Sequence, residues 1–160
     1  MSGGQMMAFH AQRGMALLVS LVFLLLLTLI GISSMQNATL QEKMAGSVSL
    51  RNQSFQTAEA ALRVGESAVQ LESFTLAVCS GTSQCAPPAE SSTIKAAGFN
   101  STSGVTWIAS GNGFYGVQNI GTTLTAVNVP SNTSATLYRV TAVGIAGNSR
   151  SVVESIYAKY

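Results

Sequence analysis

The chain lacks several residue types on which enzyme sites depend. It has no aspartate, its six acidic residues are all glutamate, and its only histidine is His10. These absences exclude a Ser-His-Asp triad, an aspartate-based phosphoryl-transfer site and a histidine-rich metal site. The eight basic residues are scattered, so the net charge of +2 does not indicate a nucleic-acid surface. The composition predicts a protein that is not an enzyme and has no cofactor.

Charge is also absent from a long stretch near the N-terminus. No ionisable side chain occurs between Arg13 and Glu42, and residues 15–32 read MALLVSLVFLLLLTLIGI, with only Ser20 and Thr28 polar. As a helix, these residues would span about 27 Å, close to the ~30 Å hydrocarbon core of a bilayer. The stretch predicts one membrane-spanning helix. Arg13 on its N-terminal side favours a cytoplasmic N-terminus, with the bulk of the chain outside.

A conventional secretory signal is the alternative to a retained anchor. The segment Gly31-Ile32-Ser33 forms a small-x-small site, and cleavage there would release a soluble secreted domain that begins at Ser34. The apolar run is longer than that of an ordinary signal peptide, and a single basic residue precedes the run closely. Retention as an anchor is therefore the favoured interpretation.

The two cysteines, Cys79 and Cys85, enclose the short segment Ser-Gly-Thr-Ser-Gln. Two sulfur ligands cannot complete a structural zinc site, and no second cysteine pair follows them. A placement outside the cytoplasm favours a disulfide that closes a small surface loop. A cytosolic placement would instead leave two free thiols.

No turn signal interrupts the chain between the apolar run and about Leu76, and the first proline is Pro87. Apolar residues recur at every seventh position in the second part of this segment: Val48, Phe55, Leu62, Val69 and Leu76. This spacing predicts one apolar stripe on a helix. We expect a single long helix that is apolar on all sides in its first half and amphipathic in its second half.

After Pro88 the chain is rich in Ser, Thr, Gly and Asn, and its hydrophobic period falls to two. The strand candidates are Val105–Ala109, Phe114–Ile120, Leu124–Val129, Thr136–Ile145 and Arg150–Ala158. Turn residues at 110–113 and 146–149 join two pairs of these strands into hairpins. A sheet of this kind needs cover on one face, and the amphipathic helix is the available element. We therefore predict an α+β fold in which one long N-terminal helix packs on a C-terminal antiparallel sheet.

The N-terminal region resembles that of a known family. A short polar leader ends in Arg13-Gly14 and is followed at once by an uncharged helix, which resembles the type III signal of type IV pilins. Residues 12–17 (QRGMAL), 41–46 (QEKMAG) and 55–63 (FQTAEAALR) resemble the N-terminal region of PilX-type minor pilins. The resemblance is specific over roughly residues 12–66 and is only architectural beyond them.

The resemblance implies how the chain is processed and where it acts. In that family a prepilin peptidase cuts after the glycine and methylates the new N-terminus, which corresponds here to Gly14 and Met15. A chain of this kind lies in the inner membrane with its bulk in the periplasm, and then enters the pilus fibre at the cell surface. The implied partners are the prepilin peptidase, the major pilin, other minor pilins and the inner-membrane assembly machinery.

A pilin-like fold also implies a division of the chain. The expected parts are a leader at 1–14, a transmembrane and fibre-core half of the helix at 15–40, an amphipathic half at 41–78, and an extracytoplasmic β-rich part at 79–160.

One position departs from the family's pattern. Most pilins carry glutamate at the fifth mature position, and the fifth residue counted from Met15 is Val19. In the family, that glutamate is taken to neutralise the N-terminal ammonium of the subunit added just before, because a lone ammonium in apolar surroundings is costly. A subunit with nothing above it meets no such ammonium, as in the related tip pseudopilin of type II secretion, which also lacks the glutamate. Val19 thus favours a priming subunit at the fibre tip, and family drift is the alternative.

Three functions are consistent with the sequence. The first is a structural minor pilin that helps to initiate type IV pilus assembly at the tip. The second is the analogous minor pseudopilin of a type II secretion system, which would share the anchor and the leader. The third is a secreted binding module released by a conventional signal peptidase. The mature N-terminal residue separates them, because Met15 supports the first two and Ser34 the third.

Overall fold

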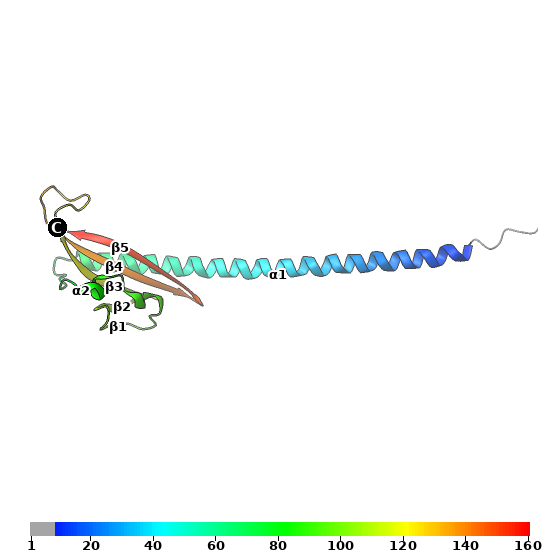
Figure 1. Cartoon of the computed structure of the whole chain (residues 1–160), viewed down its shortest axis with the longest axis horizontal. Coiled ribbons are helices and arrows are strands. Elements are labelled where there is room, and N and C mark those ends of the chain that lie inside the picture. The colour runs from blue at the N-terminus through cyan, green and yellow to red at the C-terminus, as the bar shows by residue number, and fades with distance from the viewer. Residues whose placement is uncertain (1–8) are drawn as a thin grey trace, which may run out of the picture. The chain divides into compact units, whose positions relative to one another are not determined.

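The computed structural model describes the backbone of residues 9–160 and the side chains of residues 14–160, so residues 1–8 of the expected leader lie outside the described residues. The chain forms two compact units, Met1–Gly46 and Ser47–Tyr160, and the boundary between them falls inside the first helix. The elements are α1 (Phe9–Gln70), α2 (Gly81–Cys85), the 3-10 helix η1 (Ala89–Ser92), β1 (Gly98–Phe99), β2 (Thr106–Ser110), β3 (Gly113–Thr123), β4 (Ala135–Ala146) and β5 (Ser149–Lys159) (Figure 1).

The first unit contains the apolar part of α1. Its most apolar window has a mean hydropathy of 2.9 and is not buried inside the protein, and by length and composition the helix can cross a membrane. The hydroxyl groups of Ser20 and Thr28 donate to the carbonyls of Leu17 and Leu25, at 2.9 Å and 2.8 Å. These internal bonds satisfy both hydroxyls without water, which makes them tolerable in an apolar environment.

The second unit is built on a five-stranded sheet in the order β1-β2-β3-β4-β5, with antiparallel pairing throughout. The β4–β5 pair runs without interruption from Thr136↔Lys159 to Ala146↔Ser149. Gly111 and Gly147, at the two expected hairpin turns, have φ values of 56° and 53°. Glycine adopts this left-handed conformation at no steric cost, so both turns follow directly from the sequence.

One face of the sheet is covered by the second half of α1. The fully buried positions of α1 recur at intervals of three or four, as expected for one face of a helix: Ser54, Ala58, Ala61, Gly65 and Val69. Ala61 packs with Tyr115 and Ala142 of the sheet, and Val69 packs with Tyr138 and Val140. Most of these helix residues are small, so the helix backbone lies close to the strands.

Glycines mark the closest approach between α1 and the strands. A Cβ atom added at Gly144 of β4 would lie 2.0 Å from the Ser54 carbonyl oxygen and 2.3 Å from the Ala58 nitrogen. A Cβ atom at Gly65 of α1 would lie 2.6 Å from Cγ1 of Val140. Such separations exclude any side chain, so the packing of α1 on the sheet depends on glycine at both positions.

The other face of the sheet is covered by the segment that follows α2. Val105, Trp107 and Val143 are buried there with Ile94 against them. The Glu90 carboxylate accepts hydrogen bonds from the Ser103 hydroxyl and, at 3.1 Å, from Nε1 of Trp107. This pairing satisfies the buried indole N–H and holds η1 on the sheet.

The structure confirms the α+β pilin-like fold, with one long N-terminal helix on an antiparallel sheet. It corrects the end of the helix, which lies at Gln70 and not near Leu76, so residues 71–78 of the expected amphipathic half are not helical. Lys159 Nζ donates to the carbonyls of Leu71 and Phe74, at 2.5 Å and 3.1 Å. The chain is thereby held at the end of β5 and turns toward the sheet.

Two further expectations were wrong. Val48 and Phe55, assigned to the apolar stripe, are 58% and 46% exposed, because the face of α1 that meets the sheet carries the small residues instead. The expected strand Leu124–Val129 is a loop, in which Asn128 has a φ of 62° and Val127 is 85% exposed. The short strand β1 was not expected from the sequence.

We predict that Gly144→Ala destabilises the folded domain by about 3 kcal/mol, because the added methyl group collides with the α1 backbone. Gly46→Ala is the matched control, since a Cβ atom there meets nothing within 4 Å, and it should raise helix stability by up to about 1 kcal/mol. Urea unfolding of the processed chain in detergent micelles measures both. An unchanged midpoint for Gly144→Ala would show that the close approach is not needed.

Candidate functional site: the start of the helix and the disulfide loop

The expected cleavage position lies within α1. A Cβ atom added at Gly14 would meet no other atom within 4 Å, and the Met15 side chain is 64% exposed. The folded chain therefore has room for any side chain at Gly14. A requirement for glycine there has to come from an enzyme that binds the backbone closely.

Val19 lies in an uncharged part of the helix surface. Its side chain is 48% exposed, and its neighbours one turn away are Met15 and Phe23. No ionisable residue occurs from Gly14 to Gln41, so this segment offers no counter-charge to an acid at position 19. The surface around Val19 is suited to apolar contact alone.

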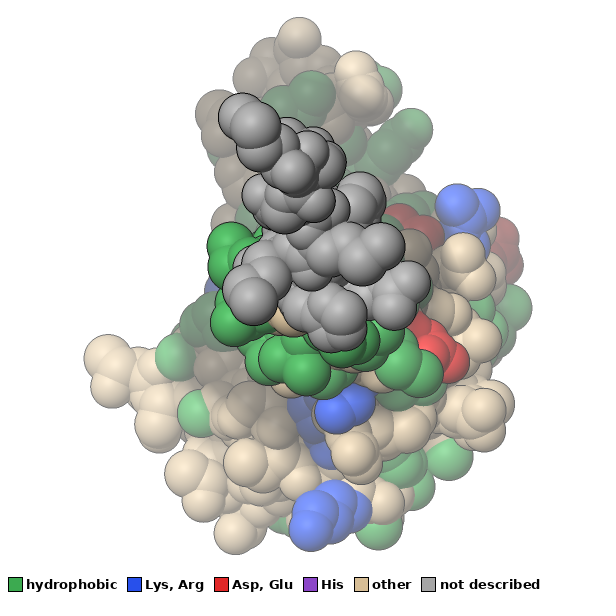
Figure 2. Space-filling model, turned by 90° about the vertical axis from the view of Figure 1, so that its right-hand side faces the viewer, with side chains coloured by type: hydrophobic (Ala, Val, Ile, Leu, Met, Phe, Trp, Pro, Cys, Tyr) green, Lys and Arg blue, Asp and Glu red, His purple; other side chains and the backbone are tan. Residues whose placement is uncertain are grey.

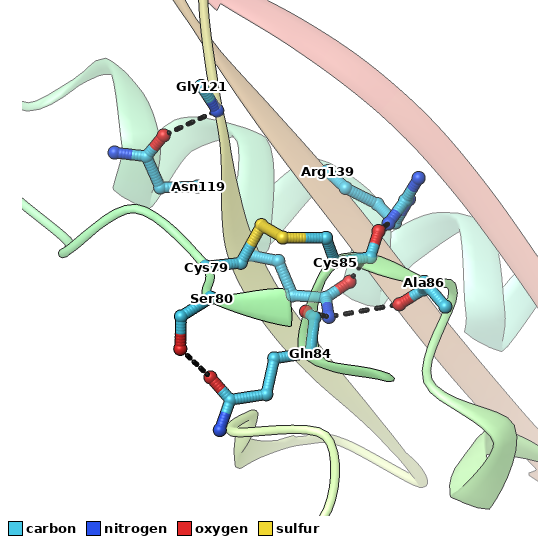
Figure 3. Close-up of a disulfide and its surroundings, with 9 residues drawn as sticks. Cys79, Ser80, Gln84, Cys85, Ala86, Asn119, Gly121 and Arg139 are labelled. Carbon is cyan, nitrogen blue, oxygen red and sulfur yellow. Dashed lines mark hydrogen bonds between the residues drawn. A yellow bond between two sulfur atoms is a disulfide. The ribbon is translucent and has the colours of Figure 1, made fainter. Parts of the chain in front are cut away.

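Cys79 and Cys85 form a disulfide, with their Cα atoms 5.2 Å apart, and the bond closes a loop that contains α2 (Figure 3). The Cys79 amide donates to the Asn119 carbonyl of β3 at 2.8 Å, and Val78 makes a parallel bridge to the same residue. The first cysteine is therefore fixed to the bulged part of β3, between Asn119 and Gly121.

Two side chains from the sheet hold the rest of the disulfide loop. Nε2 of Gln118 donates to the carbonyls of Gln84 and Ala86, at 2.6 Å and 3.1 Å. Nη1 of Arg139 donates to the Cys85 carbonyl at 2.7 Å (Figure 3). Nε of Arg139 also pairs with the Glu154 carboxylate at 3.2 Å. Backbone carbonyls of the loop are thus satisfied by the sheet, which fixes the conformation of the loop.

Sequence reasoning identified the two cysteines but missed Gln118, Asn119 and Arg139. Their signal is the presence of polar residues in strands that are otherwise mainly apolar, with Gln118 and Arg139 directly opposite each other in the β3–β4 register. The partners of Gln118 and Arg139 in the loop are backbone carbonyls, which every residue type carries. For that reason the sequence pattern alone could not show which segment they hold.

Chemistry-bearing groups do not gather elsewhere in the part of the chain that the structure describes. Among residues 14–160, no group of three or more His, Cys, Asp or Glu side chains is placed to hold a metal ion. Charged side chains are few and separated on the face shown in Figure 2. The described residues thus hold no candidate metal centre, and the face shown has no continuous basic stripe of the kind that binds nucleic acid.

Residues 13–63 match the family model described as PilX N-terminal. Over these residues the chain is similar to the N-terminal region of PilX-type pilins. The match covers less than half of the chain, and comparison with curated proteins and with solved structures gives no match. It includes Gly14, Val19 and the buried positions Ser54 and Ala58 of α1, and it ends before the sheet and the disulfide loop begin.

The PilX family consists of minor components of type IV pili, and its members are structural and not enzymatic. The long apolar start of α1 fits a membrane-anchored pilin that later enters a pilus. The similarity is therefore confined to the helix, whereas the sheet and the disulfide loop lie outside the matched region.

We predict that Cys79→Ser lowers the free energy of unfolding by about 1–3 kcal/mol, because a small disulfide loop restricts the unfolded chain only modestly. The loop should stay folded, since Gln118 and Arg139 still hold its carbonyls. Urea unfolding of the processed chain measures the loss, and non-reducing digestion of the parent chain should yield one linked peptide. Free alkylation of both thiols in membrane or pilus fractions would contradict the bond.

Proposed function

We propose that this chain is a minor pilin that helps to initiate type IV pilus assembly, at the tip of the fibre. The observation that carries the proposal is Val19, an apolar residue at the fifth position of a processed chain that would begin at Met15. A shaft subunit needs a carboxylate there to meet the ammonium of the subunit above it, because a buried unpaired charge is costly. A subunit at the head of the fibre has no such need.

Processing is the second part of the proposal. A prepilin peptidase would cut between Gly14 and Met15 and methylate the new N-terminus. The open surroundings of Gly14 support this assignment, because the fold gives no reason of its own for glycine at that position.

The apolar helix and the disulfide support a proposed location for the chain in the cell. Before assembly, residues 15–40 would span the inner membrane, and the rest of the chain would lie in the periplasm. The bond between Cys79 and Cys85 supports this orientation, since disulfides persist in oxidising compartments. The partners there would be the major pilin, other minor pilins and the assembly machinery.

We predict that Gly14→Val blocks maturation and leaves the full-length precursor in the membrane, because a β-branched side chain prevents close access to the scissile bond. Gly46→Val is the matched control, since it changes another open glycine of α1 and should be processed normally. Mass spectrometry identifies the N-terminal residue of each variant. A mature N-terminus at Ser34, or normal maturation of Gly14→Val, would contradict the assignment.

We predict that Val19→Glu lowers pilus initiation or leaves it unchanged, and does not increase incorporation along the shaft. The new acid would lack a partner at the head of the fibre, at a cost of about 3 kcal/mol in apolar surroundings. Val22→Glu is the matched control, because Val22 is similarly exposed at 46% and lies one turn further along α1. Both variants should therefore change the number of fibres per cell to a similar degree.

Immunogold labelling of the parent chain tests its position directly, and we expect label at fibre ends or bases. Deletion of the chain should reduce the number of fibres more than their length, because a priming complex acts once per fibre. Regular labelling along the shaft, together with better incorporation of Val19→Glu than of Val22→Glu, would show that the missing carboxylate is only drift. Normal piliation with a loss of type II secretion would identify a pseudopilin instead.

A further inference from the structure

A groove of about 990 Å³ lies within the domain formed by residues 47–160. One wall is a flank of α1, from Gln53 to Val64, next to the face that packs on the sheet. The other walls are the turn between β2 and β3, the turn between β4 and β5, and Lys95 from the segment before β1. Its volume falls within the usual range for small-molecule sites.

Four of the polar side chains that line this groove are not used by the fold. Gln53 and Asn112 take part in hydrogen bonds through their backbone carbonyls, which accept from Thr57 Oγ1 at 2.9 Å and from the Ile145 amide at 3.2 Å. Within residues 14–160, the side chains of Gln53, Gln56, Asn112 and Lys95 make no hydrogen bond to other protein groups. The Gln118 side chain, by contrast, donates hydrogen bonds that hold the disulfide loop.

Three carboxamide side chains line the groove. Gln53 and Gln56 are three residues apart on α1 and both line the groove, and Asn112 lines it from the β2–β3 turn. Each carboxamide offers both a donor and an acceptor, which is the combination that adjacent hydroxyl groups of a sugar require. Ala60 and Val64 add apolar surface beside them, suited to the C–H face of a pyranose ring.

The groove is lined by a positive charge and by no negative charge. Lys95 lines it, and no aspartate or glutamate does. An ammonium group without a carboxylate beside it attracts an anion and disfavours a cation. The preferred ligand is therefore a sugar that carries a carboxylate.

The geometry points to a binding site for an acidic oligosaccharide in this groove, with the amides of Gln53, Gln56 and Asn112 on the sugar hydroxyls and Lys95 on the carboxylate. An extended peptide is a poorer match, because the groove walls are a helix flank and two turns and offer no free strand edge. The site belongs to the folded domain and does not depend on the proposed role at the fibre tip.

The test uses the processed full chain in detergent micelles and three acidic probes: a hyaluronan tetrasaccharide, a trigalacturonate and 3′-sialyllactose. We expect at least one probe to bind with a Kd of about 1 mM or tighter, and the neutral tetramer of N-acetylglucosamine to bind at least about fivefold more weakly. Saturation-transfer NMR and calorimetry measure both. Failure of all three acidic probes would overturn the proposal.

Two substitutions in the groove test whether the probes bind there. Lys95→Gln should weaken the acidic probe about fivefold and leave the neutral sugar unchanged, whereas Gln56→Leu should weaken both about tenfold. Both side chains are exposed, so the urea midpoint should not move. Arg63→Gln is the matched control, because it removes the same charge from an exposed position of α1 outside the groove.

Two results would overturn the assignment. Equal weakening by Arg63→Gln and Lys95→Gln would mean that the probe responds only to net charge. Loss of crosslinking to neighbouring pilins in Lys95→Gln and Gln56→Leu, with no sugar bound by the parent chain, would make the groove an interface between subunits.

Discussion

The close approach between α1 and β4 is the constraint on which the domain depends. At Gly144 the strand lies so near the helix backbone of Ser54 and Ala58 that a methyl group does not fit. Polar contacts then fix the neighbouring strand to the same helix, since the Ser54 hydroxyl lies 2.7 Å from that of Ser151, and the Ser155 hydroxyl donates to Glu66 at 2.6 Å. Small residues and hydroxyl pairs thus form the contact at this end of the domain, whereas larger side chains such as Val69, Tyr138 and Val140 pack together further along the helix.

With the helix on one face, the opposite face of the sheet is free to hold the irregular part of the chain. Gln118 and Arg139 project there, next to helix-facing residues in the same strands, and their donors satisfy the carbonyls of the disulfide loop. The disulfide closes a segment that the sheet already holds in place. The loop is therefore a fixed surface of the domain.

The two units of the chain meet different physical demands. The domain satisfies its own buried polar side-chain groups, with no unpaired buried nitrogen or oxygen among the described side chains. The apolar start of α1 leaves large side chains exposed, including Leu17 at 72% and Phe23 at 63%, so it needs a bilayer or other apolar helices around it. The family match, residues 13–63, covers this apolar start and most of the helix that follows it.

The sequence by itself determined the uncharged apolar segment, the helix that contains it and the hairpin turns, because each depends on local composition or on glycine at a turn. Tertiary structure decided which face of α1 is buried and where the helix ends. The β4–β5 turn lies against Leu50, whereas the stripe residue Val48 is 58% exposed, and small residues further along meet the strands. From a strand position 88 residues away, Lys159 binds the Leu71 carbonyl just past the end of the helix, and no local pattern encodes a contact at that distance in sequence.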